Sequence, residues 1–338
     1  MIGIGAGRQA ILSHFVPNVG WLYMNIFEFL GLPEDHRNHP FMLVKHRGEV
    51  PEKKLTFPCY AQVKRDGIFS AVVVRNDGVV GIFGRTGKKL ANVEQLEAAC
   101  SDWPTGVYLG ELQSMALDVY LESLSGVVNP NRTEPLDFIG QQIKDNLYID
   151  FFDMLTIKAF HDGFTDVSYL KRYDALHRRI GSHLSGCNAI LPITPCHNER
   201  EVEAFAQEQI DSGREGAVFK LDVEYESGHK GYRQTKIVRM VSYDLTCIGW
   251  EEGKGKYKGK VANLIFKWKG GKTIKAMLGK GWTHADAEQM FHDIKHGGRL
   301  NVIGKIFEVK GLQDSSKGNI RLPKAGELRH DKDEPDFF

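Results

Sequence analysis

The segment YAQVKRDGIFS, residues 60–70, places a lysine, a carboxylate and a glycine together in a pattern that could do chemistry. Lys64 ends an apolar, strand-like run and is followed by Arg65, Asp66 and Gly67. Two interpretations fit this segment alone: an exposed hairpin turn, or a nucleophilic amine at the floor of a phosphate site. An amine attacks phosphorus only as its free base, so a lysine in that role needs a pKa below the usual value of about 10.4.

Further short motifs follow at intervals along the chain, and each of them alone occurs readily by chance. They are GRTG (84–87), LGEL (109–112), DFFDML (150–155), EGAVFK (215–220), YRQTKIV (232–238) and RHDK (329–332). With KRDG (64–67) at its head, the ordered set resembles the nucleotidyltransferase motifs of ATP-dependent DNA ligases. The likeness is greatest to the minimal phage and viral enzymes, and it spans about residues 59–332.

This resemblance implies an α+β fold in which a nucleotidyltransferase (adenylation) domain is followed by a C-terminal OB-fold β-barrel. It also implies three nucleotidyl transfers that use ATP and Mg²⁺ (or Mn²⁺) and seal a nick in double-stranded DNA. Lys64 would form a lysyl–AMP phosphoramidate and release pyrophosphate. Asp66 would orient this nucleophile or, later, activate the 3′-hydroxyl, and Gly67 would let the backbone approach the nucleotide. Lys236 completes the implied catalytic set by neutralising charge in the transition state.

The nucleotide-binding residues implied by the resemblance carry groups suited to ribose, base, metal or phosphate. Glu111 would accept hydrogen bonds from the ribose hydroxyls, and Phe152 would stack on adenine. Glu215, together with Glu111, would bind the metal ion, which prefers oxygen ligands. The implied phosphate contacts are all basic side chains: Lys64, Arg85, Lys220, Lys236, Arg329 and Lys332. Arg329 and Lys332 belong to the final motif, which also contains Asp331.

Two positions depart from the family pattern. Family members commonly have an arginine two residues after the KxDG glycine, where this chain has Phe69. They also commonly have two lysines two residues apart near position 236, where this chain has Val238 two residues after Lys236. The phosphate at the nick is therefore left to Arg85, Arg65 or another base, and one phosphate contact near position 236 is missing or moved.

A lysine-rich stretch in the C-terminal part of the chain has chemistry of its own. Residues 253–280 contain nine lysines and no Asp or Glu, although the formal net charge of the whole chain is only +1. Such an excess is typical of a nucleic-acid backbone contact, and also of a solvated loop and strand face. The interleaved Tyr257, Phe266 and Trp268 favour nucleic acid. The expected DNA contacts are Arg65, Arg85, Lys254, Lys256, Lys258 and Lys260.

The elements that must position these residues follow from periodicity and turn chemistry. Apolar runs predict strands in 59–83, with a hairpin tip at Asn76-Asp77-Gly78, and at VYLGEL, LYIDFFDML and AVFK. Helical spacing predicts helices at 92–100 after an Asn92/Gln95 cap, at 169–180, and after an Asn198/Glu201 cap. Mixed helices and strands of this kind indicate an α+β domain.

The remaining residues change to a barrel-like pattern. Strands are expected at 241–250, 261–269, 272–278 and 299–310, with one helix at about 284–296 between the last two. Several short strands with one inserted helix suit a small Greek-key barrel of the oligonucleotide-binding type. We expect residues 56–238 to form the adenylation domain and 239–338 the OB-fold domain. Residues 1–55 are an N-terminal extension or part of the adenylation domain.

Length and composition fit this division and exclude other classes. The 338 residues suggest about two domains, and 42% hydrophobic residues suffice for real cores. The five cysteines form no CxxC pair, which argues against a disulfide framework, a zinc site and an NAD-dependent ligase. No apolar run is long enough to span a membrane, and the N-terminus is a poor signal peptide. We therefore expect a cytoplasmic monomer of a prokaryote or phage-infected cell.

Alternatives remain open within and outside the superfamily. The nearest are an mRNA-capping guanylyltransferase, which shares the final RxDK motif, and an RNA ligase, most of which lack it. A non-catalytic DNA-binding clamp would keep only the basic barrel. The nucleotide that labels the protein, and the presence of any label at all, separate these alternatives.

Overall fold

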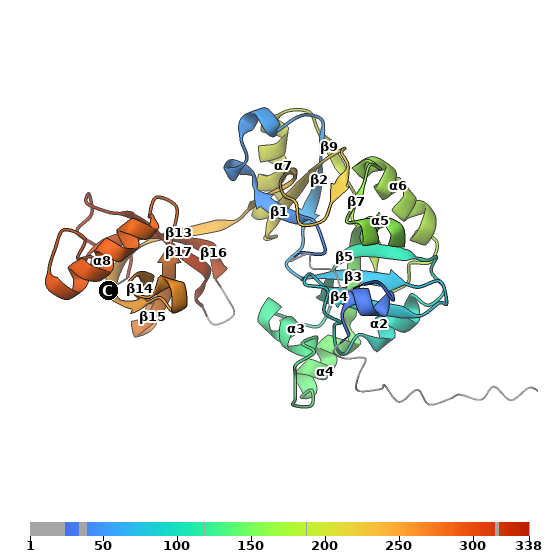
Figure 1. The fold of residues 1–338 in the computed structure, drawn as a ribbon, viewed down its shortest axis with the longest axis horizontal. Coiled ribbons are helices and arrows are strands. Elements are labelled where there is room, and N and C mark those ends of the chain that lie inside the picture. The colour runs from blue at the N-terminus through green and yellow to red at the C-terminus, as the bar shows by residue number, and fades with distance from the viewer. Residues whose placement is uncertain (1–23, 34–38, 118, 187, 315–317, 338) are drawn as a thin grey trace, which may run out of the picture. The chain divides into compact units, whose positions relative to one another are not determined.

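The computed structural model describes residues 24–337 apart from 34–38, 118, 187 and 315–317 (Figure 1). The chain forms two compact units, each assembled from three segments. The first unit contains Met1–Leu43, Gly67–Pro192 and Asp222–Arg233, and the second contains Val44–Asp66, Ile193–Leu221 and Gln234–Phe338. The chain therefore passes back and forth between the two units several times along its sequence.

The first unit is built on a five-stranded sheet of order β4-β3-β5-β6-β8. Its strands are β3 (Ile68–Val74), β4 (Val80–Gly84), β5 (Gly106–Ser114), β6 (Leu147–Leu155) and β8 (Ala189–Ile190). Only β8 runs parallel to its neighbour, β6. A separate pair consists of β7 (Phe164–Thr165) and β11 (Tyr225–Glu226). The helices are α1 (Ile26–Phe29), α2 (Glu94–Ala99), α3 (Leu121–Val127), α4 (Phe138–Asp145), α5 (Ile157–Asp162) and α6 (Tyr169–Ile180).

Alternation along the strands gives this sheet two buried faces. Val72 and Tyr108 lie in a core with Leu176 of α6, which also includes residues of α2, α3 and α4. Val73 and Leu109, each one position along its strand, lie in a second core with residues of α1 and α5. A strand buried on both faces reads as a continuous apolar run, which explains why AVVV and VYLGEL showed no polar alternation.

The second unit contains most of a five-stranded sheet of order β1-β12-β10-β2-β9. Its strands are β1 (Leu43–His46), β2 (Cys59–Lys64), β9 (Thr194–Cys196), β10 (Gly216–Leu221) and β12 (Lys230–Val238). One face packs on α7 (Glu199–Asp211), where Phe205 lies 6.3 Å from Phe219 between ring centroids. Two 3₁₀ turns, η2 (Arg47–Glu49) and η3 (Glu52–Lys54), precede β2.

A buried arginine fastens the α7 side of this sheet. Arg47 is 4% exposed and makes a bidentate ion pair with Glu199 at 2.7 and 2.6 Å. Its Nη1 also donates to Thr235 of β12 at 3.2 Å, and its guanidinium lies over the Phe219 ring. A partnered guanidinium can be buried here because its donors are engaged. Arg47 therefore joins η2, α7, β10 and β12.

The second unit also contains a closed five-stranded barrel of order β13-β14-β15-β17-β16. Its strands are β13 (Met240–Glu252), β14 (Val261–Trp268), β15 (Lys272–Leu278), β16 (Ile306–Asp314) and β17 (Ile320–Leu328). The helix α8 (His284–His296) lies between β15 and β16 in sequence, and Thr283 and Asp286 form its capping box. Turns η4 (Gly255–Tyr257) and η5 (Lys269–Gly271) join the first three strands. The predicted fold class, an α+β domain followed by an OB-type barrel, is confirmed.

Local predictions were mostly confirmed, with three corrections. Asn92 does not cap α2: it has φ +57°, and its amide donates to the Val127 carbonyl at 2.7 Å. The strand expected at 299–310 begins only at Ile306, because Gly304 makes a turn with φ +80°. The strand β17 was not predicted at all. Among the described residues, no helix has both the length and the apolar character needed to cross a membrane.

Candidate active site

Three predicted phosphate-binding lysines lie on the same face of one sheet. Residues directly opposite each other on antiparallel strands point to the same side. Gly216 of β10 is opposite Lys64, and Lys220, four positions along β10, therefore shares its side. Val218, between them, is opposite Lys236 of β12. We call Lys64, Lys220 and Lys236 the lysine face; α7 packs on the opposite side, against Phe219.

Lys64 and Glu215 form the closest contact of this site. Lys64 Nζ donates to Glu215 Oε2 at 2.5 Å, with 21% and 14% of the two side chains exposed. Glu215 immediately precedes β10, and Gly216 brings this end of the strand against β12. A Cβ at Gly216 would lie 2.2 Å from the Ile237 carbonyl oxygen. The strand pairing thus places a carboxylate on the amine that the resemblance makes a nucleophile.

The other lysines of the lysine face are not solvent-facing tips. Lys220 is only 5% exposed, although a lysine near a strand end is usually solvated. Lys236 is half-buried in β12. Lys220 therefore lies buried on the same sheet face as Lys64, where a lysine can contact the phosphate of a bound nucleotide.

Asp66 and Gly67 follow Lys64 in the turn between β2 and β3. The Asp66 carboxylate is 46% exposed and accepts hydrogen bonds from Arg321 Nη1 at 2.9 and 3.2 Å. Gly67 is required by its neighbours: a Cβ would lie 2.5 Å from the Leu112 carbonyl oxygen of β5. Close packing against β5 is thus a reason for this glycine that does not depend on a nucleotide.

In the first unit, Glu111 and Phe152 belong to the same face of the sheet. Glu111 of β5 is opposite Phe69 of β3, which lies in the core that Phe152 also contacts. The β5–β6 register shifts at Leu109/Gly110, and Phe152 is the extra residue of this bulge. A bulge re-aims a side chain, which fits an aromatic ring that is only half-buried.

The neighbouring Asp153 has a structural contact. It is buried and accepts hydrogen bonds from Arg172 of α6 at 2.9 and 3.1 Å. This ion pair fixes β6 to α6 directly after the bulge.

Phe69, the first departure from the family pattern, supports another predicted residue. The guanidinium of Arg85 lies 5.3 Å from the centroid of the Phe69 ring. Phe69 itself is 9% exposed and packs 4.8 Å from the Phe41 ring centroid. A cation over a ring face is attracted by the ring quadrupole. At the position where family members commonly have an arginine, this chain therefore has an aromatic ring that holds Arg85 in place.

The final motif forms an ion-pair network on the barrel. Arg329 donates from Nε and Nη2 to Asp331 at 2.9 and 2.8 Å, and from Nη1 to Asp244 of β13 at 2.8 and 3.0 Å. Lys332 lies 2.5 Å from the same Asp244. Hydrogen bonding from Arg329 lowers the pKa of Asp331 to about 2, and Asp331 in turn raises the pKa of Arg329.

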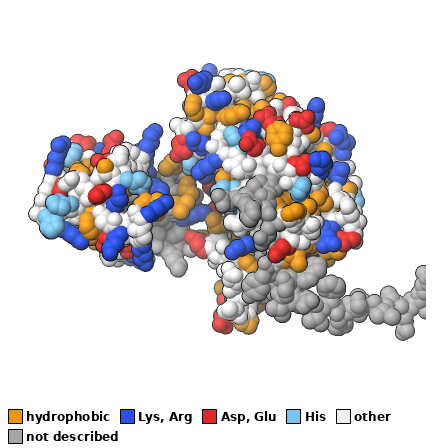
Figure 2. All heavy atoms as spheres, in the orientation of Figure 1, with side chains coloured by type: hydrophobic (Ala, Val, Ile, Leu, Met, Phe, Trp, Pro, Cys, Tyr) orange, Lys and Arg blue, Asp and Glu red, His pale blue; other side chains and the backbone are white. Residues whose placement is uncertain are grey.

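The lysine-rich stretch divides into an exposed turn and buried strand residues. Lys254, Lys256 and Lys258 are exposed around η4, whereas Lys260 pairs with Glu288 of α8 at 2.9 Å. Figure 2 shows Lys and Arg side chains on the visible face of the barrel, among acidic and His side chains. The aromatic part of the prediction was wrong for two residues, because Phe266 and Trp268 are core residues with 0% and 1% exposure. Tyr257 alone of the three is exposed, under Lys256.

The described residues offer the metal ion implied by the resemblance a single carboxylate ligand rather than a site with several protein ligands. Within the described ranges, no group of three or more His, Cys, Asp or Glu side chains has metal-binding geometry. Magnesium is commonly held by one or two carboxylates together with substrate phosphates. Glu215, beside the lysine face, is a donor of that kind.

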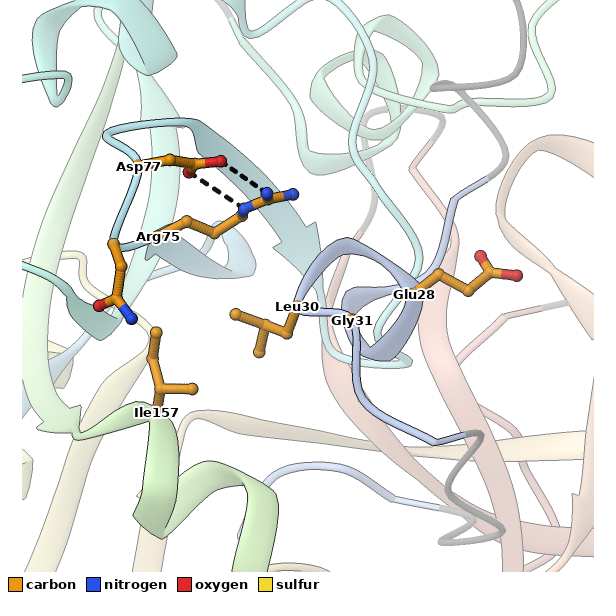
Figure 3. Close-up of a pocket in the computed structure, with 7 residues that line it drawn as sticks. Glu28, Leu30, Gly31, Arg75, Asp77 and Ile157 are labelled. Carbon is orange, nitrogen blue, oxygen red and sulfur yellow. Dashed lines mark hydrogen bonds and ion pairs between the residues drawn. The ribbon is translucent and has the colours of Figure 1, made fainter.

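A shallow cavity in the first unit does not belong to the predicted site. It has a volume of about 350 Å³, and its lining comes from α1, the β3–β4 turn and α5 (Figure 3): Glu28, Leu30, Gly31, Arg75, Asn76, Asp77 and Ile157. Arg75 is paired with Asp77 at 2.6 Å and also donates to the Phe29 carbonyl. Glu28 closes the capping box of α1 with Asn25. Its charged groups are thus used within the fold.

The strand order and the barrel with its inserted helix correspond to the fold of a nucleotidyltransferase domain followed by an OB domain. Residues 252–329 match the family of DNA ligase OB-like domains. In fold, the chain is similar to a Lig E DNA ligase, at TM-score 0.63 and 16% identity, covering 86% of this chain and 98% of that one. It is also similar to the ATP-dependent DNA ligase of bacteriophage T7, at TM-score 0.52 and 17% identity, covering 87% and 99%.

Curated relatives agree with this class over part of the chain. A probable DNA ligase of Streptomyces avermitilis is 29% identical over 190 residues, which are 53% of this chain and 36% of that protein. A probable DNA ligase of Anaeromyxobacter is 38% identical over 65 residues, 19% of this chain and 13% of that protein. The chain thus spans about a third or less of these relatives' length. The resemblance to DNA ligases is confirmed, and residues 252–329 of the barrel match the model of DNA ligase OB-like domains.

Sequence reasoning missed one residue of the final-motif network and one that holds together the sheet of the lysine face. Asp244 lies in no motif, and its only signal is a charged residue between the apolar Tyr243 and Leu245. Arg47 lies in the poorly readable N-terminal part and makes its contacts with residues more than 150 positions away. Neither contact can be inferred without the strand pairing.

Proposed function

We propose that this chain is an ATP-dependent DNA ligase that seals nicks in double-stranded DNA through a lysyl–AMP intermediate. The lysine face carries this proposal, because it places three lysines, among them Lys64, on one face of a single sheet. Negative charge spreads over the phosphate oxygens when a nucleotide is transferred in line, and fixed cations stabilise it. The likeness to DNA ligases supports DNA as the substrate.

In the first step, the lone pair of Lys64 Nζ forms a bond to the α-phosphorus of ATP. The bond from that phosphorus to the bridging oxygen breaks, and pyrophosphate leaves with the electron pair. The amine must first lose a proton to solvent, and the Glu215 carboxylate, 2.5 Å away, holds the amine in place. Lys220 and Lys236 stabilise the charge that develops on the phosphate oxygens.

In the later steps, AMP moves from Lys64 to the 5′-phosphate of the nick, and the 3′-hydroxyl then displaces it. Asp66 accepts the hydroxyl proton in the last step. Glu111 binds the ribose hydroxyls, Phe152 stacks on adenine, and Arg85, supported by Phe69, binds phosphate beside the nick.

A divalent cation fits this chemistry at Glu215. Glu215 would hold Mg²⁺ or Mn²⁺, which would shield the negative charge of the phosphate. Arg329 and Lys332 orient the leaving pyrophosphate. The lysines of η4 hold the DNA backbone, and the chain acts as a cytoplasmic monomer.

The test uses ATP labelled at the α-phosphorus, with Mg²⁺ and then nicked duplex DNA. The chain should acquire a label that survives denaturation and is discharged by the nick as the strands join. Lys64→Ala should abolish labelling. Lys158→Ala is the matched control, because Lys158 is 83% exposed and pairs with Asp162 on its own helix.

Each alternative function gives a different result. Labelling by GTP alone would indicate a capping guanylyltransferase, and discharge only by nicked RNA would indicate an RNA ligase. DNA binding without any label would indicate a non-catalytic clamp. Full labelling of Lys64→Ala would refute the assignment of the nucleophile.

A further inference from the structure

The outward side of β13 contains a carboxylate that is buried in an unusual way. Leu245 and Cys247 are fully buried in the barrel core, so the alternating Asp244 points out of the barrel. Asp244 is nevertheless only 7% exposed. The segment that follows β17, residues 329–337, covers it and supplies its partners.

Asp244 binds this segment at both ends. Its carboxylate accepts from Arg329 at 2.8 and 3.0 Å and from Lys332 at 2.5 Å. Its backbone N–H donates to the Asp336 carboxylate at 2.7 Å, and its carbonyl accepts from the Asp336 N–H at 2.8 Å. Asp244 therefore uses its side chain for the two cations and its backbone for the end of the segment.

An aromatic contact completes the attachment. Phe337 packs with ring centroids 5.5 Å from Tyr243 and 5.1 Å from Trp268. Lys269 lies over the same three rings, 5.2 Å from the centroid of Phe337. The segment is thus fixed to β13 beyond its ion pairs, and Asp244 is not a chance surface contact.

Arg329 keeps binding capacity in this arrangement. A guanidinium has five N–H donors. Nε and Nη2 each donate to Asp331, and Nη1 donates to both oxygens of Asp244, which leaves one N–H group, on Nη2, for an oxygen ligand. The carboxylates of Asp331 and Asp244 bind different nitrogens of the Arg329 guanidinium and so fix the orientation of its plane. A guanidinium held in this way binds a phosphate with a smaller loss of conformational entropy, because its side chain is already ordered.

We propose that Asp244 is a positioning residue that holds Arg329 and Lys332 as a preformed pair for the pyrophosphate of ATP. This inference rests on the proposed function. Without Asp244, Arg329 would be oriented only by Asp331, two residues away on an exposed segment, and Lys332 would lose its partner. The first step would then be slowed, whereas the last step, in which no pyrophosphate takes part, would be spared.

The experiment compares self-adenylation with sealing of a nick that already carries AMP on its 5′-phosphate. Asp244→Ala should lower the rate of self-adenylation between about 10-fold and about 100-fold and raise the ATP concentration at half-maximal rate. Pyrophosphate-driven loss of AMP from Lys64 should fall in parallel. Sealing of the pre-adenylated nick should stay within about twofold of the wild type.

Controls separate positioning from folding. Asp333→Ala, a charge loss at an exposed position of the same segment, should behave as the wild type. Asp244→Asn keeps the size and one acceptor, so it should give an intermediate rate with an unchanged melting temperature. Equal loss of sealing and self-adenylation in Asp244→Asn would indicate a structural role and overturn the inference.

The two proposals fail in different ways. If the wild-type chain takes no label from ATP, the proposed function is wrong. If the wild type is labelled and Asp244→Ala is labelled at the rate of Asp333→Ala, only the positioning role is wrong. A faster Asp244→Ala would also overturn it, because it would mean that Asp244 withholds the cations.

Discussion

Replacing Gly216 by alanine tests whether the close approach of β10 and β12 sustains the lysine face. Gly216 has φ +139°, and a Cβ there would lie 2.2 Å from the Ile237 carbonyl oxygen and 2.8 Å from the Val238 Cα. Both contacts are with backbone, so no side chain can rotate away. Real Cβ contacts stay above 3.0 Å, and the strands must therefore separate at this end.

The expected cost comes from two sources. Overpacking of this kind typically costs about 1–3 kcal/mol, and a side chain in a left-handed backbone conformation costs about 1–2 kcal/mol. A value near the middle, about 3 kcal/mol, lowers the melting temperature of a domain of 150–250 residues by about 6–12 °C. Because Gly216 is directly opposite Lys64 and follows Glu215 in the chain, we also expect a loss of self-adenylation.

The matched control is Gly213→Ala in the turn just before β10. Gly213 has φ +78° but no atom within 4 Å of the added Cβ, so only the conformational cost of about 1–2 kcal/mol applies. Thermal and urea unfolding of the two variants measure the difference. If Gly216→Ala is as stable as Gly213→Ala, the steric argument is refuted. If it is destabilised but labels Lys64 at the wild-type rate, the coupling to Glu215 is refuted.

Three further predictions concern single groups. Burial raises the pKa of Cys59 to about 11 and that of Cys100 to about 12, so neither thiol should be alkylated at pH 8 until the chain unfolds, as mass spectrometry would detect. Hydrogen bonding from Arg329 lowers the pKa of Asp331 to about 2, and its contribution to stability is therefore present above about pH 4 and lost as the pH falls toward 2. Carbon-detected NMR should show this midpoint, and Arg329→Gln should move it upward; an unchanged midpoint would count against the ion pair. Lys-to-Glu changes at the exposed lysines of 254–260 should weaken DNA binding and reduce the slope of log K against log salt by about 0.9 for each phosphate that is no longer neutralised. Self-adenylation should be spared, and equal loss of both activities would argue against η4 as a DNA-binding element.

The fold could be predicted from the sequence where a local pattern determines structure. The apolar runs of β5 and β6, and the capped helix α7, have signals within a dozen residues. By contrast, β17 contains Pro323 and Gly326, which weaken a strand pattern, and it was missed. Asn92 matched the pattern of a helix cap, but its side chain instead donates a hydrogen bond to the Val127 carbonyl, a tertiary contact that the local sequence does not show.

The candidate site was predictable in residue types but not in arrangement. Lys64 and Lys220 are separated by more than 150 positions, and nothing local shows that β2 and β10 are neighbours. The resemblance to a family suggested the roles of these lysines, whereas the register of β2 and β10 showed that their side chains share one face of the sheet. Phe69 shows the limit of a motif, because a departure from the pattern proved to be the ring beneath Arg85.

The alternation of chain segments between the two units has a consequence for synthesis. The sheet of the lysine face takes β2 from near the start of the chain, and β10 and β12 only after the main sheet of the first unit has been made. A nascent chain emerging from the ribosome therefore cannot finish that sheet until residue 238 is free. No gene truncated at a single point can encode the first unit intact and omit the second.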